Sequence, residues 1–282
     1  MHALSNETLV KALETNEIIK HEAVAKAMLH CERRRYCLSY SSNARDEDGR
    51  EGNEERLWYR DRPLPIGFNA TISAPHMHAL CLNFAYEHFL KNSNCYSSSR
   101  RRTSKEEDDD DDDDDDKEEI TILDIGCGSG YLLGCFSALI PNKKTKVIGI
   151  EHIEELVDRA IENLIKDKKK DLLDRGLIEV IKGDGRDGYE KGSRKYDLIH
   201  VGACAKELPQ KLIDQLKAPG RLIIPCVKNN SEDNTDDDED PNNRSQSLLV
   251  VDKHENGTIV VKNEMDVMYV PLTDEKSQLV LN

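Results

Sequence analysis

The stretch ITILDIGCGSGYLLGCFSALI, residues 120–140, carries the signal that decides the fold. Its first part, ITILDIG, is short and largely apolar and predicts a buried strand, and its last part, YLLGCFSALI, predicts a helix. Between them, Gly126, Gly128 and Gly130 form a turn in which the backbone can approach a ligand closely. Because ligands of open α/β sheets bind at the carboxyl ends of the strands, this unit predicts a binding site.

The residues that follow this unit repeat the alternation of strand and helix. Strands are expected at residues 120–126, 146–151, 178–184, 196–203 and 220–227, and helices at residues 131–140, 153–167 and 209–216. This alternation predicts an α/β fold with a parallel sheet covered on both faces. Residues 246–273 predict instead a strand, a hairpin turn at Asn256–Gly257, a second strand and a final strand. We therefore expect antiparallel strands at one edge of the sheet.

The residues before the glycine turn predict mainly helices. Residues 5–31 favour two short helices broken around Asn16. The polar residues 38–62 favour a loop. The stretch NATISAPHMHALCLNFAYEHF, residues 69–89, then runs into a helix, with Ser73 as its expected N-cap and Pro75 in its first turn.

The spacing of glycines and acidic residues indicates which ligand the turn binds. A dinucleotide fingerprint has the pattern G-x-G-x-x-G, and Tyr131 stands where its third glycine would be, which disfavours a nicotinamide-dependent oxidoreductase. The pattern here is G-x-G-x-G with Asp124 two residues earlier, which suits S-adenosylmethionine, a ligand without a pyrophosphate. Glu151, at the end of the next strand, is placed to accept both ribose hydroxyls, and Asp184 follows the third strand near the expected adenine. Taken alone, each feature could be purely structural.

Two acidic tracts account for the net charge of the chain, which is −15 from 40 Lys and Arg against 55 Asp and Glu. Residues 105–119 carry 13 acidic and 2 basic side chains, and residues 229–244 carry 7 and 1, so the rest of the chain is almost neutral. Such runs are predicted to be disordered. The acidic balance argues against nucleic-acid binding, and we interpret the basic cluster SRRRTSK, residues 99–105, as a solvated segment.

Cysteine usage and hydropathy indicate the compartment. The 8 cysteines are scattered through apolar stretches and form no C-x-x-C pair, which favours buried thiols over a disulfide framework or a zinc site. The first residues, MHALSNETLVKALETN, do not resemble a secretory signal, and no window is long and apolar enough to span a bilayer. We therefore expect a cytoplasmic protein with no membrane partner.

Beyond the glycine turn, the chain resembles the protein-L-isoaspartate O-methyltransferase family. The resemblance rests on IGFNATISAPHMHA, LDIGCGSGYL, VIGIEHIEELVDRAIENLIKD, VIKGDGRDGY, YDLIHVGACA, LPQKLIDQLKAPGRLIIP and YVPLTDEKSQ, and it covers about four-fifths of the chain. It implies a Rossmann-like class I S-adenosylmethionine-dependent methyltransferase fold with an N-terminal helical cap. The implied single domain, residues 1–282, consists of N-terminal helices and cap (1–93), an acidic disordered insert (94–119), a cofactor-binding α/β core (120–228), a second acidic disordered insert (229–245) and C-terminal strands (246–282).

The element ATISAPHMHA is the specific part of this resemblance, because generic methyltransferases share only the glycine turn. In the family this stretch covers the cofactor, and the resemblance places the serine near the reacting carboxylate at Ser73. Two departures are modest, since Glu151 stands where Asp is usual and KAPGR stands where KPGGR is usual. The cofactor contacts expected from the glycine turn and the resemblance together are Ala70, Thr71, Ile72, Ser73, His78, Asp124, Gly126, Gly128, Ser129, Glu151, His152, Asp184, Gly185, Thr273 and Gln278.

The reaction that the resemblance implies is methyl transfer from S-adenosylmethionine to the α-carboxylate of L-isoaspartyl residues in damaged proteins, by a monomer. A carboxylate is ionised at pH 7, so Ser73 is expected to orient it, and no G-x-S-x-G motif marks Ser73 as a nucleophile. His76 and His78 are too few ligands for a metal, so no metal is expected, and we interpret His200 as a core histidine. Two alternatives stay open: a homologue that binds the cofactor without turnover as an adaptor, and a methyltransferase for another carboxylate.

Overall fold

The computed structural model describes residues 3–38, 57–92, 119–189, 194–228 and 245–280. Apart from Glu119, both acidic tracts lie outside these residues, and so does the basic cluster at residues 99–105. The prediction that the tracts are disordered therefore remains untested.

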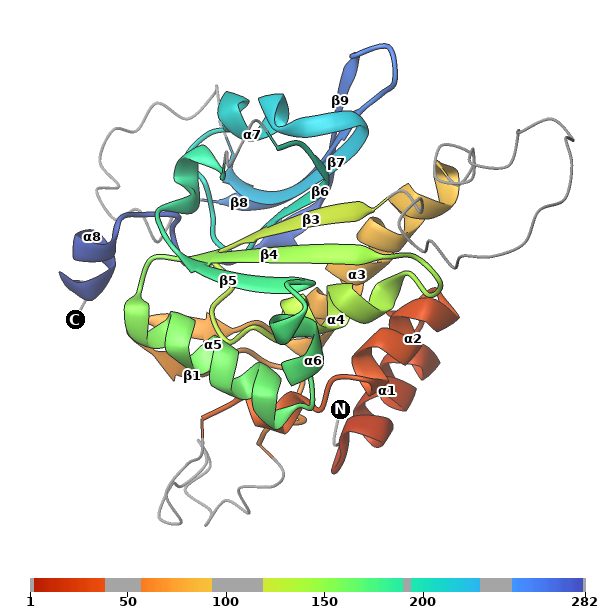
Figure 1. Ribbon diagram of the computed structural model, residues 1–282, viewed down its shortest axis with the longest axis vertical. Helices are drawn as coiled ribbons and strands as arrows, with labels where there is room; N and C mark the ends of the chain where they lie inside the picture. The colour runs from red at the N-terminus through yellow and green to blue at the C-terminus, as the bar shows by residue number, and fades with distance from the viewer. Residues whose placement is uncertain (1–2, 39–56, 93–118, 190–193, 229–244, 281–282) are drawn as a thin grey trace, which may run out of the picture.

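A seven-stranded sheet forms the centre of the molecule, with the strand order β5-β4-β3-β6-β7-β8-β9 (Figure 1). Its strands are β3 (Ile120–Ile125), β4 (Thr145–Glu151), β5 (Ile178–Lys182), β6 (Tyr196–Val201), β7 (Leu216–Val227), β8 (Gln246–Lys253) and β9 (Ile259–Val267). The strands from β5 to β7 pair in parallel, whereas β8 and β9 pair antiparallel. The predicted parallel sheet with antiparallel edge strands is confirmed.

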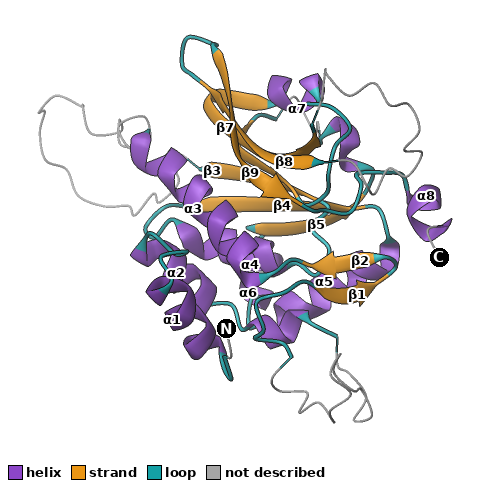
Figure 2. Ribbon diagram, turned by 180° about the vertical axis from the view of Figure 1, so that it is seen from behind, coloured by secondary structure: helices purple, strands orange, loops and turns teal. Residues whose placement is uncertain are grey.

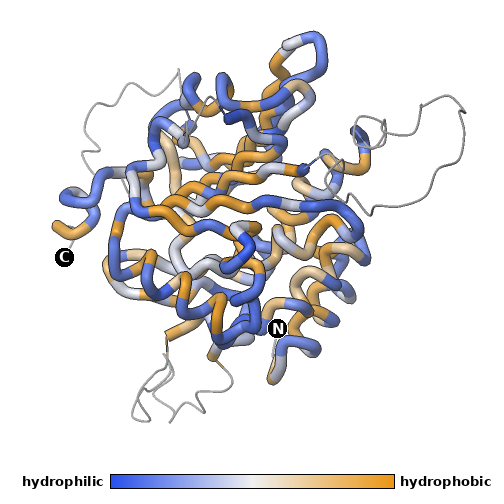
Figure 3. Tube along the Cα trace, in the orientation of Figure 1, coloured by the Kyte–Doolittle hydropathy of each residue, from blue (hydrophilic) through white to orange (hydrophobic). Residues whose placement is uncertain are grey.

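Helices cover both faces of the sheet. They are α3 (Pro75–Lys91), α4 (Tyr131–Leu139), α5 (Glu154–Lys166), α6 (Lys170–Asp174) and α7 (Gln210–Asp214). Successive side chains of a strand point to opposite faces, so Ile122 joins the core that contains α3 and α4, and Leu123 joins the core that contains α7. Figures 1 and 3 show α7 on one side of the apolar central strands and α4 and α5 on the other.

Two short helices, α1 (Asn6–Thr15) and α2 (Glu22–Leu29), add an N-terminal layer next to α4 (Figure 2). The break at Asn16 is confirmed, because Asn16 is the C-cap of α1. Buried Asn6 ties the layer together, since its amide donates to Met28 O at 2.9 Å and to Cys31 O at 3.0 Å. Within the described residues, no helix is both long and apolar enough to cross a bilayer.

Two sequence predictions were wrong in detail. Ser73 is not the N-cap of α3, because Ala74 takes that position and makes no side-chain cap bond, while Pro75 is the first helical residue. The predicted final strand is absent from residues 268–273, where Pro271 forms only an isolated bridge with Cys204. A proline has no N–H with which to continue a strand ladder.

Six short elements in the described part of the chain were not predicted. They are β1 (Leu64–Gly67), β2 (Ala70–Ile72), α6, α8 (Glu275–Val280) and two short 3-10 helices, Arg33–Tyr36 and Gly185–Asp187. β1 and β2 form an antiparallel hairpin whose turn residues, Phe68 and Asn69, have positive φ angles of 53° and 56°. Since asparagine tolerates this conformation far better than phenylalanine does, the sequence gives only a weak turn signal here.

Candidate functional site

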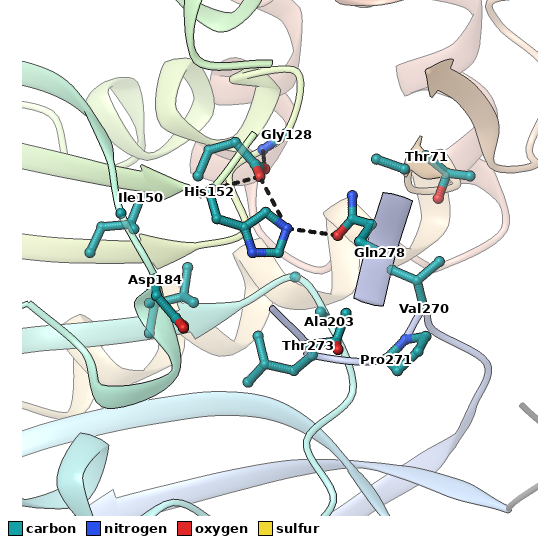
Figure 4. Close-up of a pocket in the computed structure, with 18 residues that line it drawn as sticks. Thr71, Gly128, Ile150, His152, Asp184, Ala203, Val270, Pro271, Thr273 and Gln278 are labelled. Atoms are coloured by element: carbon teal, nitrogen blue, oxygen red, sulfur yellow. Dashed lines mark hydrogen bonds and ion pairs between the residues drawn. The ribbon is translucent and has the colours of Figure 1, made fainter. Parts of the chain in front are cut away.

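A cavity lies at the carboxyl ends of β3, β4 and β6, where the sequence predicts ligand binding (Figure 4). It measures about 60 Å³, and a wider groove of about 480 Å³ adjoins it between the β1–β2 hairpin and the segment that follows β9. The residues that line the cavity are Ala70, Thr71, Ile125, Gly126, Gly128, Ile150, Glu151, His152, Gly183, Asp184, Gly185, Gly202, Ala203, Val270, Pro271, Leu272, Thr273 and Gln278.

The glycine turn forms one wall of this cavity. Gly126 and Gly128 have φ angles of +71° and +50°. Residues other than glycine adopt such positive φ angles only at a cost in conformational energy. A Cβ atom at Gly126 would meet no atom within 4 Å, so the backbone here faces open space. A Cβ at Gly202 would instead lie 2.8 Å from Gly126 O, which shows how closely the end of β6 packs under the turn.

Glu151 is the acidic group at the head of the cavity. Its carboxylate accepts hydrogen bonds from Gly128 N at 3.1 Å, His152 N at 2.8 Å and Ile153 N at 3.2 Å. Burial raises the pKa of Glu151, and these backbone donors and the His152 charge oppose that rise. The carboxylate therefore fixes the turn and still presents lone pairs to a ligand.

Gln278, from α8, closes the cavity between two distant segments. Its side-chain amide donates to Phe68 O at 2.8 Å, and its Oε1 lies 2.8 Å from His152 Nε2 (Figure 4). Asn69 Nδ2 donates in return to Gln278 O at 2.8 Å. These bonds join α8, the β1–β2 hairpin and the end of β4 across the cavity.

The structure brings together most of the cofactor contacts that the sequence predicts. The expected residues that line the cavity are Ala70, Thr71, Gly126, Gly128, Glu151, His152, Asp184, Gly185, Thr273 and Gln278. The other expected contacts do not line the cavity, and all of them except Ser73 are buried; they are Ile72, Ser73, His78, Asp124 and Ser129. Ser129 is buried in the turn itself, where its carbonyl accepts from Asn163 Nδ2 at 3.1 Å.

Ser73 and His78 share a partner that the sequence analysis missed, the fully buried Arg33. Its guanidinium donates to Ser73 O at 2.8 Å, and its Nη1 lies 3.3 Å from His78 Nδ1. Burial and the charge of Arg33 hold the pKa of His78 well below its usual value, so the imidazole is neutral. The motif RRRY gives no sign that this particular arginine is buried.

The Asp124 side chain contacts the His200 side chain on the neighbouring strand β6. The Asp124 Oδ1 and His200 Nδ1 atoms are 2.7 Å apart, and both side chains are buried. Burial lowers the pKa of His200, but hydrogen bonds to Asp124 and Cys81 outweigh burial and raise it to about 10. His200 is therefore a charged core histidine.

Asp184 is half-exposed at the rim of the cavity and is engaged by Arg186. The guanidinium of Arg186 contacts both carboxylate oxygens, at 2.6 to 3.0 Å, and this hydrogen bonding lowers the pKa of Asp184. A ligand that bonds Asp184 therefore shares it with Arg186.

Several lining residues were not predicted as contacts. They are Ile125, Ile150, Gly183, Gly202, Ala203, Val270, Pro271 and Leu272. The first five stand at or directly after predicted strand ends, so the rule that ligands bind at carboxyl ends could have found them. Among the described residues, no group of three or more His, Cys, Asp and Glu side chains could hold a metal ion.

Comparison with known proteins shows which family has this sequence and fold. The family model described as Protein-L-isoaspartate(D-aspartate) O-methyltransferase matches residues 4–94 and 116–277. Protein-L-isoaspartate O-methyltransferase 1 of Arabidopsis thaliana is 35% identical over 274 residues, which cover 97% of this chain and 94% of the relative. Protein-L-isoaspartate O-methyltransferase 2 of the same plant is 40% identical over 221 residues, or 78% of this chain, and the match spans 57% of that relative's length.

A solved structure supports the same assignment. A Plasmodium falciparum chain, described as a protein-L-isoaspartate O-methyltransferase in complex with S-adenosyl-L-homocysteine, aligns with a TM-score of 0.66. It is 28% identical, and the alignment covers 95% of this chain and 98% of that chain. The predicted class I methyltransferase fold is confirmed.

Proposed function

Because the chain belongs to the protein-L-isoaspartate(D-aspartate) O-methyltransferase family, we propose that it transfers a methyl group from S-adenosylmethionine to the α-carboxylate of L-isoaspartyl residues in damaged proteins. The observation that carries the proposal is the juxtaposition of the glycine turn, the Glu151 carboxylate and the first two residues of the ATIS segment, Ala70 and Thr71, around one cavity. The family resemblance predicted from ATISAPHMHA is confirmed by the match of the family model.

The residues around the cavity fit S-adenosylmethionine. The open space beside Gly126 allows a flat or extended group to lie directly against the backbone. The Glu151 carboxylate offers acceptors for a ribose diol, and His152 and Gln278 add polar atoms beside it. The apolar ends of β3 and β4, Ile125 and Ile150, offer surfaces for an adenine ring near Asp184.

The cofactor, when bound, supplies an electrophilic methyl group on a sulfonium centre. The substrate carboxylate is already ionised at neutral pH, so the protein needs no strong base. Its task is to align the carboxylate and to exclude water, and alignment can lower the barrier substantially. We assign the orienting hydrogen bond to Ser73, which directly follows Thr71 and Ile72 of the hairpin that covers the cavity.

A pair of peptides that differ only in one linkage tests the proposal. The purified protein should form a base-labile methyl ester on an L-isoaspartyl peptide, measured as the methanol that base treatment releases, and none on its normal aspartyl counterpart. Equal labelling of both peptides would indicate another carboxylate substrate. Binding of S-adenosylhomocysteine by calorimetry without turnover on either peptide would indicate a binding module instead.

We further propose that the protein acts as a cytoplasmic monomer on protein substrates and does not bind nucleic acid. The 7 cysteines that the structure describes are free, as is usual in a reducing compartment. The net charge of −15 disfavours a phosphate backbone as partner. Light scattering of the protein as it elutes from a size-exclusion column tests whether it is a monomer. Cell fractionation tests its cytoplasmic location.

The domain organisation is likewise a proposal. We propose a single domain, residues 1–282, that the two acidic inserts interrupt. Its support is the sheet, in which β8 from the C-terminal part pairs with β7 of the α/β core along Gly220–Val227. Limited proteolysis should cleave within residues 94–119 and 229–245 and leave fragments that stay associated.

A further inference from the structure

Arg33 is buried in an unusual way for an arginine. It is 0% exposed, and its guanidinium donates to two backbone carbonyls, Trp58 O at 3.0 Å and Ser73 O at 2.8 Å. The guanidinium also contacts two rings, with Nη1 at 3.3 Å from His78 Nδ1 and the guanidinium carbon 5.8 Å from the centre of the Tyr131 ring. A buried charge costs free energy unless its donors are satisfied, so such a residue needs a structural or functional reason.

The three nitrogen atoms of this guanidinium connect three separate segments. Trp58 precedes the hairpin, Ser73 joins the hairpin to α3, and His78 lies in the first turn of α3. The neutral His78 can accept from Arg33, because its pKa is held far below the usual value. Only the planar fork of an arginine presents donors in these three directions at once.

The carbonyl of Ser73 is the contact with a consequence for the site. Its bond to Arg33 restrains the peptide plane between Ser73 and Ala74. This plane sets the ψ angle of Ser73, which is one of the torsions that orient its Cα–Cβ bond. Arg33 therefore restrains the backbone of the residue that we assign to substrate alignment.

We propose that Arg33 is a positioning residue for methyl transfer, which sets the orientation of Ser73 through the Ser73 carbonyl. This inference rests on the proposed function, in which the Ser73 hydroxyl aligns the substrate carboxylate. Arg33 is fully buried and does not line the cavity, and neither do Ser73 and His78, the two expected cofactor contacts that it touches. The loss of Arg33 should therefore lower the turnover number and leave cofactor binding nearly unchanged.

The substitution that tests this is Arg33→Lys, which keeps the charge and removes the fork. We expect kcat on an isoaspartyl peptide to fall about 10- to 100-fold, the range expected for a lost hydrogen bond from a charged donor, with S-adenosylhomocysteine affinity within about 3-fold. Arg35→Lys is the chemical control, because Arg35 lies in the same short helix (Arg33–Tyr36) and its guanidinium contacts Lys166 O and Asp167 instead. That control should keep kcat.

A double-substitution cycle separates positioning from general damage. In a Ser73→Ala background, Arg33→Lys should cause no further fall in kcat, because the group that it orients is gone. Asn83→Ala supplies a stability control, since buried Asn83 bonds Lys20 N and Ile18 O without touching Ser73. The inference is wrong if Arg33→Lys lowers kcat equally in the wild-type and Ser73→Ala backgrounds. It is also wrong if Asn83→Ala, at the same loss in Tm as Arg33→Lys, lowers kcat as much as Arg33→Lys does.

A second variant covers the case in which Arg33→Lys does not fold. Replacing Ala74 with L-lactic acid turns the Ser73–Ala74 amide into an ester and weakens the Ser73 carbonyl as an acceptor, while every other side chain stays. A fall in kcat of about 3-fold or more supports the inference, and an unchanged kcat contradicts it. A wild-type protein that binds S-adenosylhomocysteine but methylates no isoaspartyl peptide would contradict the proposed function instead.

Discussion

His200 Nδ1 lies 2.7 Å from Asp124 Oδ1, on adjacent parallel strands directly behind the glycine turn. The pKa of His200 is raised to about 10, against an ordinary value of 6.5. A group whose pKa is higher in the folded state stabilises the fold fully below its unfolded value, and this contribution is lost as the pH rises through the folded value. We therefore predict that the free energy of unfolding falls between about pH 6.5 and pH 10, by up to about 1.4 kcal/mol per pH unit from this group.

Denaturant titrations across this pH range measure the effect. The variant His200→Gln should lose this component of the slope and be less stable below pH 6.5, because Asp124 is left without its cation. His88→Gln is a control of opposite sign. Burial and the charge of Arg221 lower the pKa of His88 to about 4, so its effect lies between pH 4 and 6.5. A slope above pH 6.5 that persists in His200→Gln would contradict the assignment.

A second prediction concerns the ionised state of Glu151. Its carboxylate is held by three backbone N–H groups, and burial raises its pKa above the ordinary value. Cofactor affinity should therefore decrease as the pH is lowered from neutral towards the ordinary Glu value of 4.5, since protonation removes acceptors. In Glu151→Gln, affinity for S-adenosylhomocysteine should be weaker by about 10-fold or more and should no longer depend on pH in this range. Calorimetry at several pH values checks both statements, and an unaltered affinity would refute the ribose assignment.

A third prediction concerns how the ligand leaves. Gln278 lines both the cavity of about 60 Å³ and the adjoining groove of about 480 Å³, and its side chain bonds His152 and Phe68. We expect a ligand that leaves the cavity through the groove to pass Gln278. Gln278→Ala should accelerate dissociation of S-adenosylhomocysteine by about 10-fold, measured by stopped flow. Lys276→Ala, an exposed change on the same helix, should leave the rate unchanged, and equal rates in all three proteins would exclude this role for Gln278.

The α/β core could be predicted because its signals are local and repeated. The apolar strand in ITILDIG and the amphipathic pattern with Leu156, Ala160 and Leu164 buried on one face of α5 each follow from short-range periodicity. The glycine turn and Glu151 could be predicted for the same reason, because each lies at the carboxyl end of a strand that the local pattern predicts. Placing these residues at the site therefore required no knowledge of distant contacts.

The elements that escaped prediction depend on partners far away in the sequence. Ser73 resembles an N-cap locally, but its carbonyl is bound by Arg33, 40 residues earlier. Residues 268–273 resemble a strand, but Gln246 bonds Tyr269 and Cys204 bonds Val270. These single bonds hold the segment in place, and it does not form the continuous hydrogen-bond pattern of a strand. The charged pair of Asp124 and His200 likewise follows only from the register of β3 against β6.

The last prediction concerns Ser73 itself, and it follows from where Ser73 lies. Ser73 is next to the cavity-lining residues of the hairpin but does not line the cavity. The variant Ser73→Ala should therefore keep S-adenosylhomocysteine affinity within a few-fold while lowering kcat on an isoaspartyl peptide by about 10- to 1,000-fold, the range expected for one lost aligning hydrogen bond. Ser137→Ala is the control, since its hydroxyl donates to Gly134 O within α4, away from the site, and it should keep kcat. Steady-state kinetics with both substrates varied distinguishes the outcomes, because a rise in KM for the cofactor in place of a fall in kcat would make Ser73 a cofactor contact and remove it from substrate alignment.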